Sequence, residues 1–245
     1  MTMTQSLQAI STPSITDLDR LNEQFAQSHP KSILLWCLEN MPEGMVQTTA
    51  FGLSGMVIMD LLYRDLNPEQ RVPVIFLDTL HHFSETLNLV ERSKELYNLD
   101  LKVYRPADAE DRESFAATYG DSLWETDVNQ FHQLTKVDPL QKAFEEQHVT
   151  SWITGRRRDQ SASRSTMPIF ELDASQRIKI NPLANWTNRD VWKYIMENHV
   201  PYNVLHDQGY GSIGDEPLTT PIAAGEHERD GRWRGSEKTE CGIHL

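Results

Sequence analysis

Segments with strand character that alternate with helical segments constrain the fold of this chain more than any other feature. Apolar and β-branched runs at residues 45–50, 72–77, 101–104 and 149–154 predict strands, and helical stretches separate them, notably residues 84–98. Strands that alternate with helices pair in parallel through helical crossovers. We therefore predict an α/β fold with a twisted, mostly parallel sheet flanked by helices.

Polar residues follow three of these predicted strands at the point where each strand ends. A glycine-containing loop, residues 51–55, leads from the first strand into an apolar helical segment. Asp78 and Thr79 follow the second strand, and an arginine-rich run at 155–161 follows the last. Ligands of open α/β sheets bind at the carboxyl ends of the strands, and a strand–loop–helix unit can cradle a phosphate. We expect these segments to converge on one anion site.

Each of these signals also has a simpler explanation. The loop could be a tight strand-to-helix turn without a ligand, Asp78-Thr79 could cap the next helix, and an arginine run is usually a solvated face. The loop lacks the G-x-G-x-x-G and G-x-x-x-x-G-K-[ST] fingerprints, which disfavours a dehydrogenase or a kinase.

Charge limits the partners of the chain. A formal net charge of −13 repels nucleic acid and anionic membranes, so a bound anion must be small and held locally. The basic residues cluster in the run 156–158, with Arg164 close behind, and again at Arg229, Arg232 and Arg234.

Length and composition predict one large domain with appendages. We expect residues 1–17 to be flexible, 18–210 to form the α/β body with two helices in 18–40, and 211–245 to be a loose, mobile tail. The N-terminus has no signal-peptide pattern and no apolar run approaches membrane-spanning length, so we expect a cytoplasmic protein. Two cysteines are too few for a disulfide framework or a four-thiolate metal site, so no metal is expected.

The chain ends with a thiol next to charged groups. Cys241 could be an incidental tail residue, but a flexible end can also carry a thiolate into a cleft, as thiol-transfer chemistry requires. His244 could donate or accept a proton in the reaction, or it could be a solvated terminal histidine. Cys37 lies in an apolar helical run and is predicted to belong to the core.

Five motifs in one order carry a family resemblance. The ending 240–244, Glu-Cys-Gly-Ile-His, resembles the Glu-Cys-Gly-Leu-His ending of phosphoadenylyl-sulfate (PAPS) reductases, thioredoxin-dependent enzymes of sulfate assimilation. Residues 48–55 resemble the modified pyrophosphate loop of that family, 136–140 its Lys-x-x-Pro-Leu segment and 155–161 its arginine loop. Residues 225–233 are similar to a stretch seen in relatives that reduce adenylyl sulfate (APS). The chain is therefore identified as a member of the PAPS/APS reductase family.

The resemblance implies a reaction. The fold would be that of the adenine nucleotide alpha hydrolases, and PAPS would be reduced to sulfite and adenosine 3′,5′-bisphosphate through a thiosulfonate on Cys241. Thioredoxin or glutaredoxin would donate the electrons, in a homodimer that serves cysteine biosynthesis. A thiolate is a suitable nucleophile toward sulfur, but a cysteine with an ordinary pKa of about 8.5 needs cationic neighbours to ionise near neutral pH.

The resemblance also implies substrate contacts. Thr49, Gly52, Ser54 and Gly55 would lie at the nucleotide phosphates, Asp78 and Thr79 on the adenosine side, Lys136 with Arg157 or Arg158 at the phosphosulfate, and Arg229 and Arg232 over it from the tail.

One departure from the family concerns an iron–sulfur cluster. Cluster-bearing APS reductases carry a Cys-Cys pair upstream of the motif lysine and a later Cys-x-x-Cys; here residues 131–134 are Phe-His-Gln-Leu, and Asp215 and Leu218 replace the second pair. The resemblance then implies no cluster and a preference for PAPS, with the residue that reads the 3′-phosphate not singled out.

Three other functions stay open on the sequence alone. An APS reductase without a cluster would share the motifs. An adenylating ATP pyrophosphatase should show a Ser-Gly-Gly-x-Asp-Ser loop, which residues 51–55 do not. A non-catalytic nucleotide-binding or redox-sensing module would have no reason to keep both the arginine loop and the reactive tail.

Overall fold

A computed structural model describes residues 15–41, 43–234, 238, 240 and 242–244. Its helices are α1 (Ile15–Phe25), α2 (Pro30–Asn40), α3 (Leu53–Asp60), α4 (Ser84–Tyr97), α5 (Arg112–Tyr119), α6 (Leu123–Thr126), α7 (Val128–His132), α8 (Asp138–Glu146) and α9 (Asn188–Asn198). Two π-helical segments, η1 (Leu61–Leu66) and η2 (Gln133–Val137), continue α3 and α7, and short 3₁₀ turns are η3 (Arg158–Gln160), η4 (Ala162–Arg164), η5 (Val204–Gln208) and η6 (Glu216–Leu218). No described helix is long and apolar enough to cross a membrane.

The strands form one six-stranded sheet in the order β3-β2-β1-β4-β6-β5. They are β1 (Met45–Thr48), β2 (Val74–Leu77), β3 (Leu101–Tyr104), β4 (Ser151–Ile153), β5 (Phe170–Leu172) and β6 (Ile178–Ile180). All neighbours pair in parallel except β5 and β6. The predicted mostly parallel α/β sheet is confirmed, although three of the four predicted strands are shorter than expected, and the sequence analysis did not identify β5 and β6.

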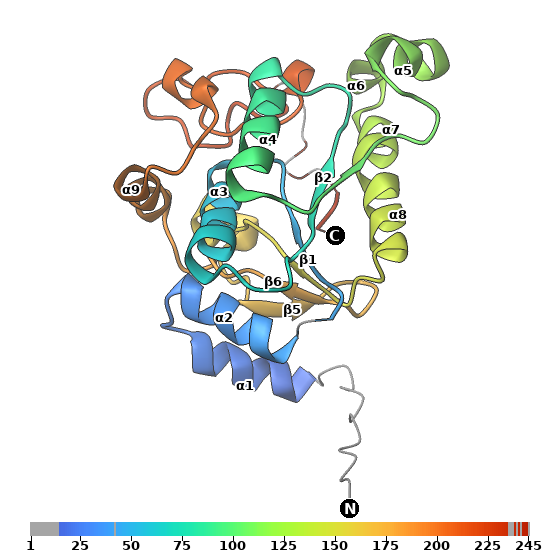
Figure 1. The fold of residues 1–245 in the computed structure, drawn as a ribbon. Helices are drawn as coiled ribbons and strands as arrows, with labels where there is room; N and C mark the ends of the chain where they lie inside the picture. Colours follow the sequence, from blue (N-terminus) through green and yellow to red (C-terminus); the bar gives the residue numbers. More distant parts are fainter. Residues whose placement is uncertain (1–14, 42, 235–237, 239, 241, 245) are drawn as a thin grey trace, which may run out of the picture.

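Helices cover both faces of the sheet because successive strand residues point to opposite sides. Met45 and Ile153 belong to a large apolar cluster with α1, α2, α3, α4 and α9, whereas their neighbours Val46 and Trp152 pack with α8. Figure 1 shows α8 on one side of the sheet and α3, α4 and α9 on the other. Every residue of α3 is buried, so this helix lies inside the protein and not on its surface.

The segment that follows α9 differs from its prediction. Residues 211–234 were expected to be loose, but Asp215, Thr219 and Trp233 are buried. Thr219 forms an antiparallel bridge with Arg232, and the Trp233 N–H donates to the Leu218 carbonyl at 2.9 Å. That expectation is wrong for 211–234, because a few anchoring side chains outweigh a composition rich in glycine, proline and charge.

The predicted N-terminal segment lies mostly outside the described residues. α1 begins at Ile15, inside the segment 1–17 that was expected to be flexible. Residues 1–14 and Cys241 are not among the described residues. The division into three segments at 17 and 210 stays a prediction.

Candidate active site

The sheet order creates a crevice between β1 and β4. The chain runs from β1 outward to β2 and β3 on one side, and it continues through β4 and β6 on the other. The loops that leave β1 and β4 therefore diverge, which is where open α/β sheets bind ligands. A cavity of about 240 Å³ lies there, lined by both loops, by Lys136 of η2 and by parts of 206–244.

The loop after β1 offers backbone N–H groups to this cavity. Gly52 is the N-cap of α3, so no capping side chain accepts hydrogen bonds from the first N–H groups of the helix. N–H groups at a helix N-terminus favour an anion. A side chain at Gly55 would place its Cβ 2.2 Å from the Thr49 hydroxyl, and one at Gly155 would place it 3.1 Å from the Gly55 nitrogen. Gly55 thus lets its own loop fold closely onto Thr49, and Gly155 lets the loop after β4 pack closely against Gly55. The structure brings Thr49, Gly52, Ser54 and Gly55 together at the cavity.

Arg157 joins the arginine loop to this cradle. Its side chain is buried and donates to the Ser54 hydroxyl at 2.7 Å, to Asp159 at 2.9 Å and to Glu228 at 2.7 Å. Arg158 turns away from the cavity: its Nε donates to the Met167 carbonyl at 2.7 Å, and it does not line the cavity. Of the two candidates that the sequence left open, only Arg157 reaches the site.

Arg156 and Arg164 also line the cavity, and the sequence analysis assigned no role to either. Arg156 donates to Glu171 and to Asn181, and Arg164 donates to Gln160 and Glu240. The arginine run and the nearby Arg164 were visible in the sequence. Which of these arginines face the cavity depends on the short turns η3 and η4, and no simple periodicity marks those turns.

A buried ion pair forms another part of the cavity wall. Lys136 in η2 donates to Asp215, which also accepts from the Thr79 hydroxyl at 2.8 Å and lies 3.7 Å from His132 Nε2. Burial alone would raise the pKa of the Asp215 carboxyl, but Lys136, His132 and His82 together outweigh burial and hold that pKa well below its usual value. Burial lowers the pKa of His132 to about 4, so this imidazole is neutral at neutral pH.

Asp78 and Thr79 separate in the structure. Thr79 lines the cavity, whereas Asp78 does not. Asp78 accepts from Arg105 at 2.8 Å and from the Leu80 N–H at 3.0 Å, so it holds the turn after β2. Neither residue caps α4, which begins at Ser84.

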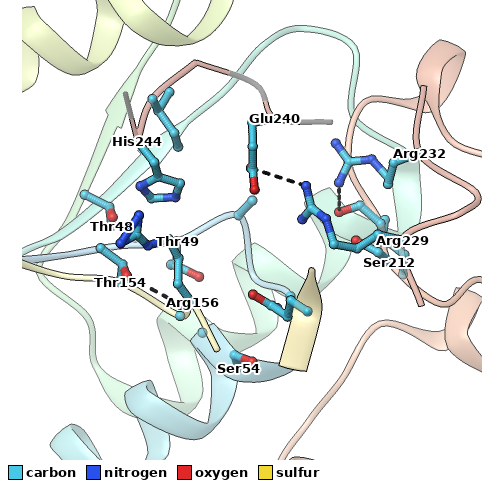
Figure 2. Close-up of a pocket in the computed structure, with 18 of the residues that line it drawn as sticks. Thr48, Thr49, Ser54, Thr154, Arg156, Ser212, Arg229, Arg232, Glu240 and His244 are labelled. Atoms are coloured by element: carbon cyan, nitrogen blue, oxygen red, sulfur yellow. Dashed lines mark hydrogen bonds and ion pairs between the residues drawn. The ribbon is translucent and has the colours of Figure 1, made fainter. Parts of the chain in front are cut away.

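Two arginines of the last segment reach the cavity, whereas Arg234 does not line it. Arg229 and Arg232 line it, and their guanidinium carbons lie 5.4 and 4.6 Å from the Trp233 ring centre. Figure 2 shows both side chains on one side of the cavity and Arg156 and His244 on the other.

His244 is held in place by contacts and is not freely solvated. Its ring stacks on Trp152 with centroids 5.6 Å apart, and its carbonyl accepts from Lys179 at 3.3 Å. Burial, together with Arg156 and other cations, lowers the pKa of its imidazole well below the usual value. Cys37 is fully buried, which confirms its place in the core, and burial raises the pKa of its thiol. The predicted nucleophile Cys241 lies outside the described residues, but Glu240, Ile243 and His244 line the cavity.

The positions of cluster ligands in APS reductases do not fit a cluster here. Asp215 and Leu218 stand where the second cysteine pair would fall; Asp215 pairs with Lys136, and Leu218 packs against an apolar cluster that contains Phe131. Upstream of the lysine, residues 131–134 are Phe-His-Gln-Leu, so this side also offers no thiolate. Among the described residues, no group of three or more His, Cys, Asp or Glu side chains could hold a metal ion.

An α/β sheet with a phosphate cradle and converging arginines at its switch point defines a class, the α/β proteins that bind a small polyanion such as a nucleotide. Comparison with known proteins identifies the family within this class. Residues 44–221 match the phosphoadenosine phosphosulfate reductase domain. The chain belongs to the phosphoadenosine phosphosulfate reductase family. The predicted family and the prediction that the protein is an enzyme are both confirmed.

Individual relatives support this assignment. Phosphoadenosine phosphosulfate reductases of Emericella nidulans and Saccharomyces cerevisiae are 48% and 45% identical over 93% of this chain and 74% and 89% of their own lengths. An adenosine 5′-phosphosulfate reductase of Halalkalibacterium halodurans is 39% identical over 93% of this chain and 96% of its own.

Solved structures agree on the fold. The PAPS reductase of Candida auris in a phosphate complex has a TM-score of 0.79 and 42% identity, covering 87% of this chain and all of that one. Candida glabrata FMN adenylyltransferase, at a TM-score of 0.57 and 19% identity over 93% of this chain and 81% of its own, shares the fold alone. The predicted adenine nucleotide alpha hydrolase-like fold is confirmed.

Proposed function

We propose that this enzyme reduces PAPS to sulfite and adenosine 3′,5′-bisphosphate. One observation carries the proposal: cationic side chains from η2, the loop after β4, η4 and the segment after η6 line one cavity beside the N-terminus of α3. They are Lys136, Arg156, Arg157, Arg164, Arg229 and Arg232. Such a concentration of positive charge in a protein of net charge −13 suits a small, highly charged anion.

The proposed first step transfers a sulfo group, SO3, to the tail thiol. The Cys241 thiolate attacks the sulfur of the phosphosulfate, the bond between that sulfur and the bridging oxygen breaks, and the bisphosphate leaves with the electron pair. Arg157, which donates to Ser54 in the first turn of α3, and the N–H groups of α3 would stabilise the phosphate charge that develops on the leaving group. The same cations would favour the ionised form of an approaching thiol.

The proposed second step needs an external dithiol. One of its thiolates attacks Sγ of Cys241, sulfite leaves, and the second thiol closes a disulfide on the donor while Cys241 returns to the reduced state. The other cysteine of this chain, Cys37, is fully buried and so is not available as a resolving thiol. We propose thioredoxin or glutaredoxin as the donor, and a cytoplasmic homodimer that serves sulfate assimilation and cysteine biosynthesis.

The runner-up is APS reduction, because relatives named adenosine 5′-phosphosulfate reductases are 39–42% identical to this chain. The proposed preference for PAPS rests on the four cluster positions, none of which is cysteine. No cluster charge lies near the sulfate in this proposal, so the affinity for the substrate must depend on another anionic group of the nucleotide. The 3′-phosphate is the one available.

We expect the purified enzyme to contain no stoichiometric iron and to show a higher kcat/KM with PAPS than with APS. Iron analysis and initial rates with the two nucleotides in competition check both statements. A stoichiometric cluster would contradict the cofactor proposal. Equal kcat/KM values for the two nucleotides would contradict the proposed preference for PAPS but not the proposed reductase activity.

Arg157 and Arg158 form a matched pair of neighbours with opposite orientations. Arg157→Gln should lower kcat/KM about tenfold to a hundredfold, because a charge-assisted hydrogen bond to phosphate contributes roughly 1.5–3 kcal/mol. Arg158→Gln should stay much closer to the wild type, since its guanidinium donates to the Met167 carbonyl outside the cavity. Steady-state kinetics on both variants decide the matter, and wild-type kinetics for Arg157→Gln would mean that this arginine does not act on the substrate.

A further inference from the structure

The cavity already contains an anion that belongs to the chain itself. Both carboxylate oxygens of Glu240 accept from Arg164, at 2.8 and 2.6 Å, and one of them also accepts from Arg229 at 3.3 Å. Arg164 is 8% exposed and also donates to Gln160. In Figure 2 the Glu240 side chain extends into the cavity, and a dashed line joins it to Arg229.

This arrangement is an oxyanion site. The planar fork of a buried arginine that donates two parallel hydrogen bonds matches carboxylate, phosphate and sulfate alike. A second arginine, Arg229, donates to the same Glu240 oxygen that accepts from Arg164. The position therefore holds a carboxylate with two guanidinium groups, and the oxygens of a phosphate ester, which carries about −1.5 to −2 charges near neutral pH, suit the same donors.

The end of the chain is attached to the body in two chemically different ways. Glu240 makes the ionic attachment just described. Ile243 packs against the apolar cluster that contains Leu140 of α8, and His244 stacks on Trp152. An anionic ligand competes with the first attachment but not with the second, since the second depends on apolar contact and ring stacking.

We propose that Glu240 is a built-in competitor for the oxyanion position formed by Arg164 and Arg229. An oxyanion of the substrate displaces the Glu240 carboxylate from the two arginines, and the contacts of Ile243 and His244 keep the end of the chain docked during the exchange. When the product leaves, the carboxylate returns and takes its place. The affinity for the product is then lower than the arginines alone would give, which favours turnover. The identity of the displacing anion as PAPS rests on the proposed function.

Glu240→Gln in the full-length protein tests this proposal, because glutamine keeps the size of the side chain and loses its charge. Calorimetric titration in a buffer without phosphate or sulfate should show the Kd for adenosine 3′,5′-bisphosphate about tenfold lower than in the wild type, the scale of one charge-assisted hydrogen bond that no longer has to be broken. Inorganic sulfate, the second probe, should also bind more tightly.

Glu226→Gln is the matched control. Glu226 pairs with Arg234 at 2.8 Å in the same segment of the chain and does not line the cavity, so the Kd for both probes should stay at the wild-type value. Arg164→Gln supplies a double-mutant cycle: in this background the Glu240→Gln change should tighten binding much less, because Arg164 makes two of the three hydrogen bonds to the carboxylate and only the one from Arg229 is left.

An unchanged or higher Kd for both probes in Glu240→Gln would overturn the proposal, as would a gain of the same size in the Arg164→Gln background as in the wild type. Tighter sulfate binding in Glu240→Gln, without nucleotide binding in any variant, would keep the proposal and remove PAPS as the substrate.

Discussion

Replacement of Cys241 by serine is expected to abolish sulfite formation while nucleotide binding stays close to that of the wild type. The proposed reaction requires a thiolate that attacks sulfur, and a serine hydroxyl is neither ionised near neutral pH nor a comparable nucleophile toward sulfur. The phosphate cradle and the arginines that line the cavity belong to other segments of the chain, so the affinity for adenosine 3′,5′-bisphosphate should persist. Sulfite release in the presence of a dithiol donor and calorimetric nucleotide binding measure the two effects.

Cys37→Ala is the control for this substitution. Cys37 is fully buried among apolar residues and behaves as a small hydrophobic side chain, so its loss should cost about 1 kcal/mol of stability with turnover retained. Sulfite production by Cys241→Ser, at any rate near that of Cys37→Ala, would rule out the proposed nucleophile.

Replacement of Asp215 by alanine is expected to destabilise the fold by about 3–5 kcal/mol. The substitution leaves Lys136 mostly buried without its carboxylate, and removing one partner of a buried ion pair costs far more than the pair contributes net. It also removes the acceptor for the Thr79 hydroxyl, and so loosens the contact between the segment after α9 and the turn after β2. The free energy of unfolding from denaturant titration measures the loss.

The adjacent Glu216 provides the control for Asp215. It also forms an ion pair, with Arg112 at 2.9 Å, but both side chains are about half exposed. Such a surface pair contributes about 0–1 kcal/mol, so Glu216→Ala should change stability little. Equal destabilisation in the two variants would show that burial of the Lys136–Asp215 pair is not what matters.

The sequence predicts those parts of the site in which a local sequence pattern also fixes where the residues lie in the fold. The glycine loop and the arginine run each follow a strand directly, and parallel strands must bring such loops to one edge of the sheet. Arg157 and Arg158 could not be separated in this way, because the turn η3 decides which of them faces the cavity.

Tertiary contacts account for what the sequence did not reveal. Glu240 and Arg164 lie 76 positions apart, and nothing near either residue predicts their pairing. Asp215 lies in a segment rich in glycine and polar residues, a composition that is typical of loose segments. Its burial depends on Lys136 and Thr79 in distant parts of the chain. The short edge strand β5 gave too weak a local pattern to be predicted from the sequence.

Mass spectrometry of the reduced enzyme after incubation with PAPS, with no dithiol present, tests the proposed chemistry most directly. A sulfonate should appear on the peptide that contains Cys241, with one equivalent of adenosine 3′,5′-bisphosphate released, and subsequent addition of thioredoxin should remove it as sulfite. An unmodified Cys241 while the bisphosphate is released, or a sulfonate on Cys37 instead, would contradict transfer of the sulfo group to the tail thiol.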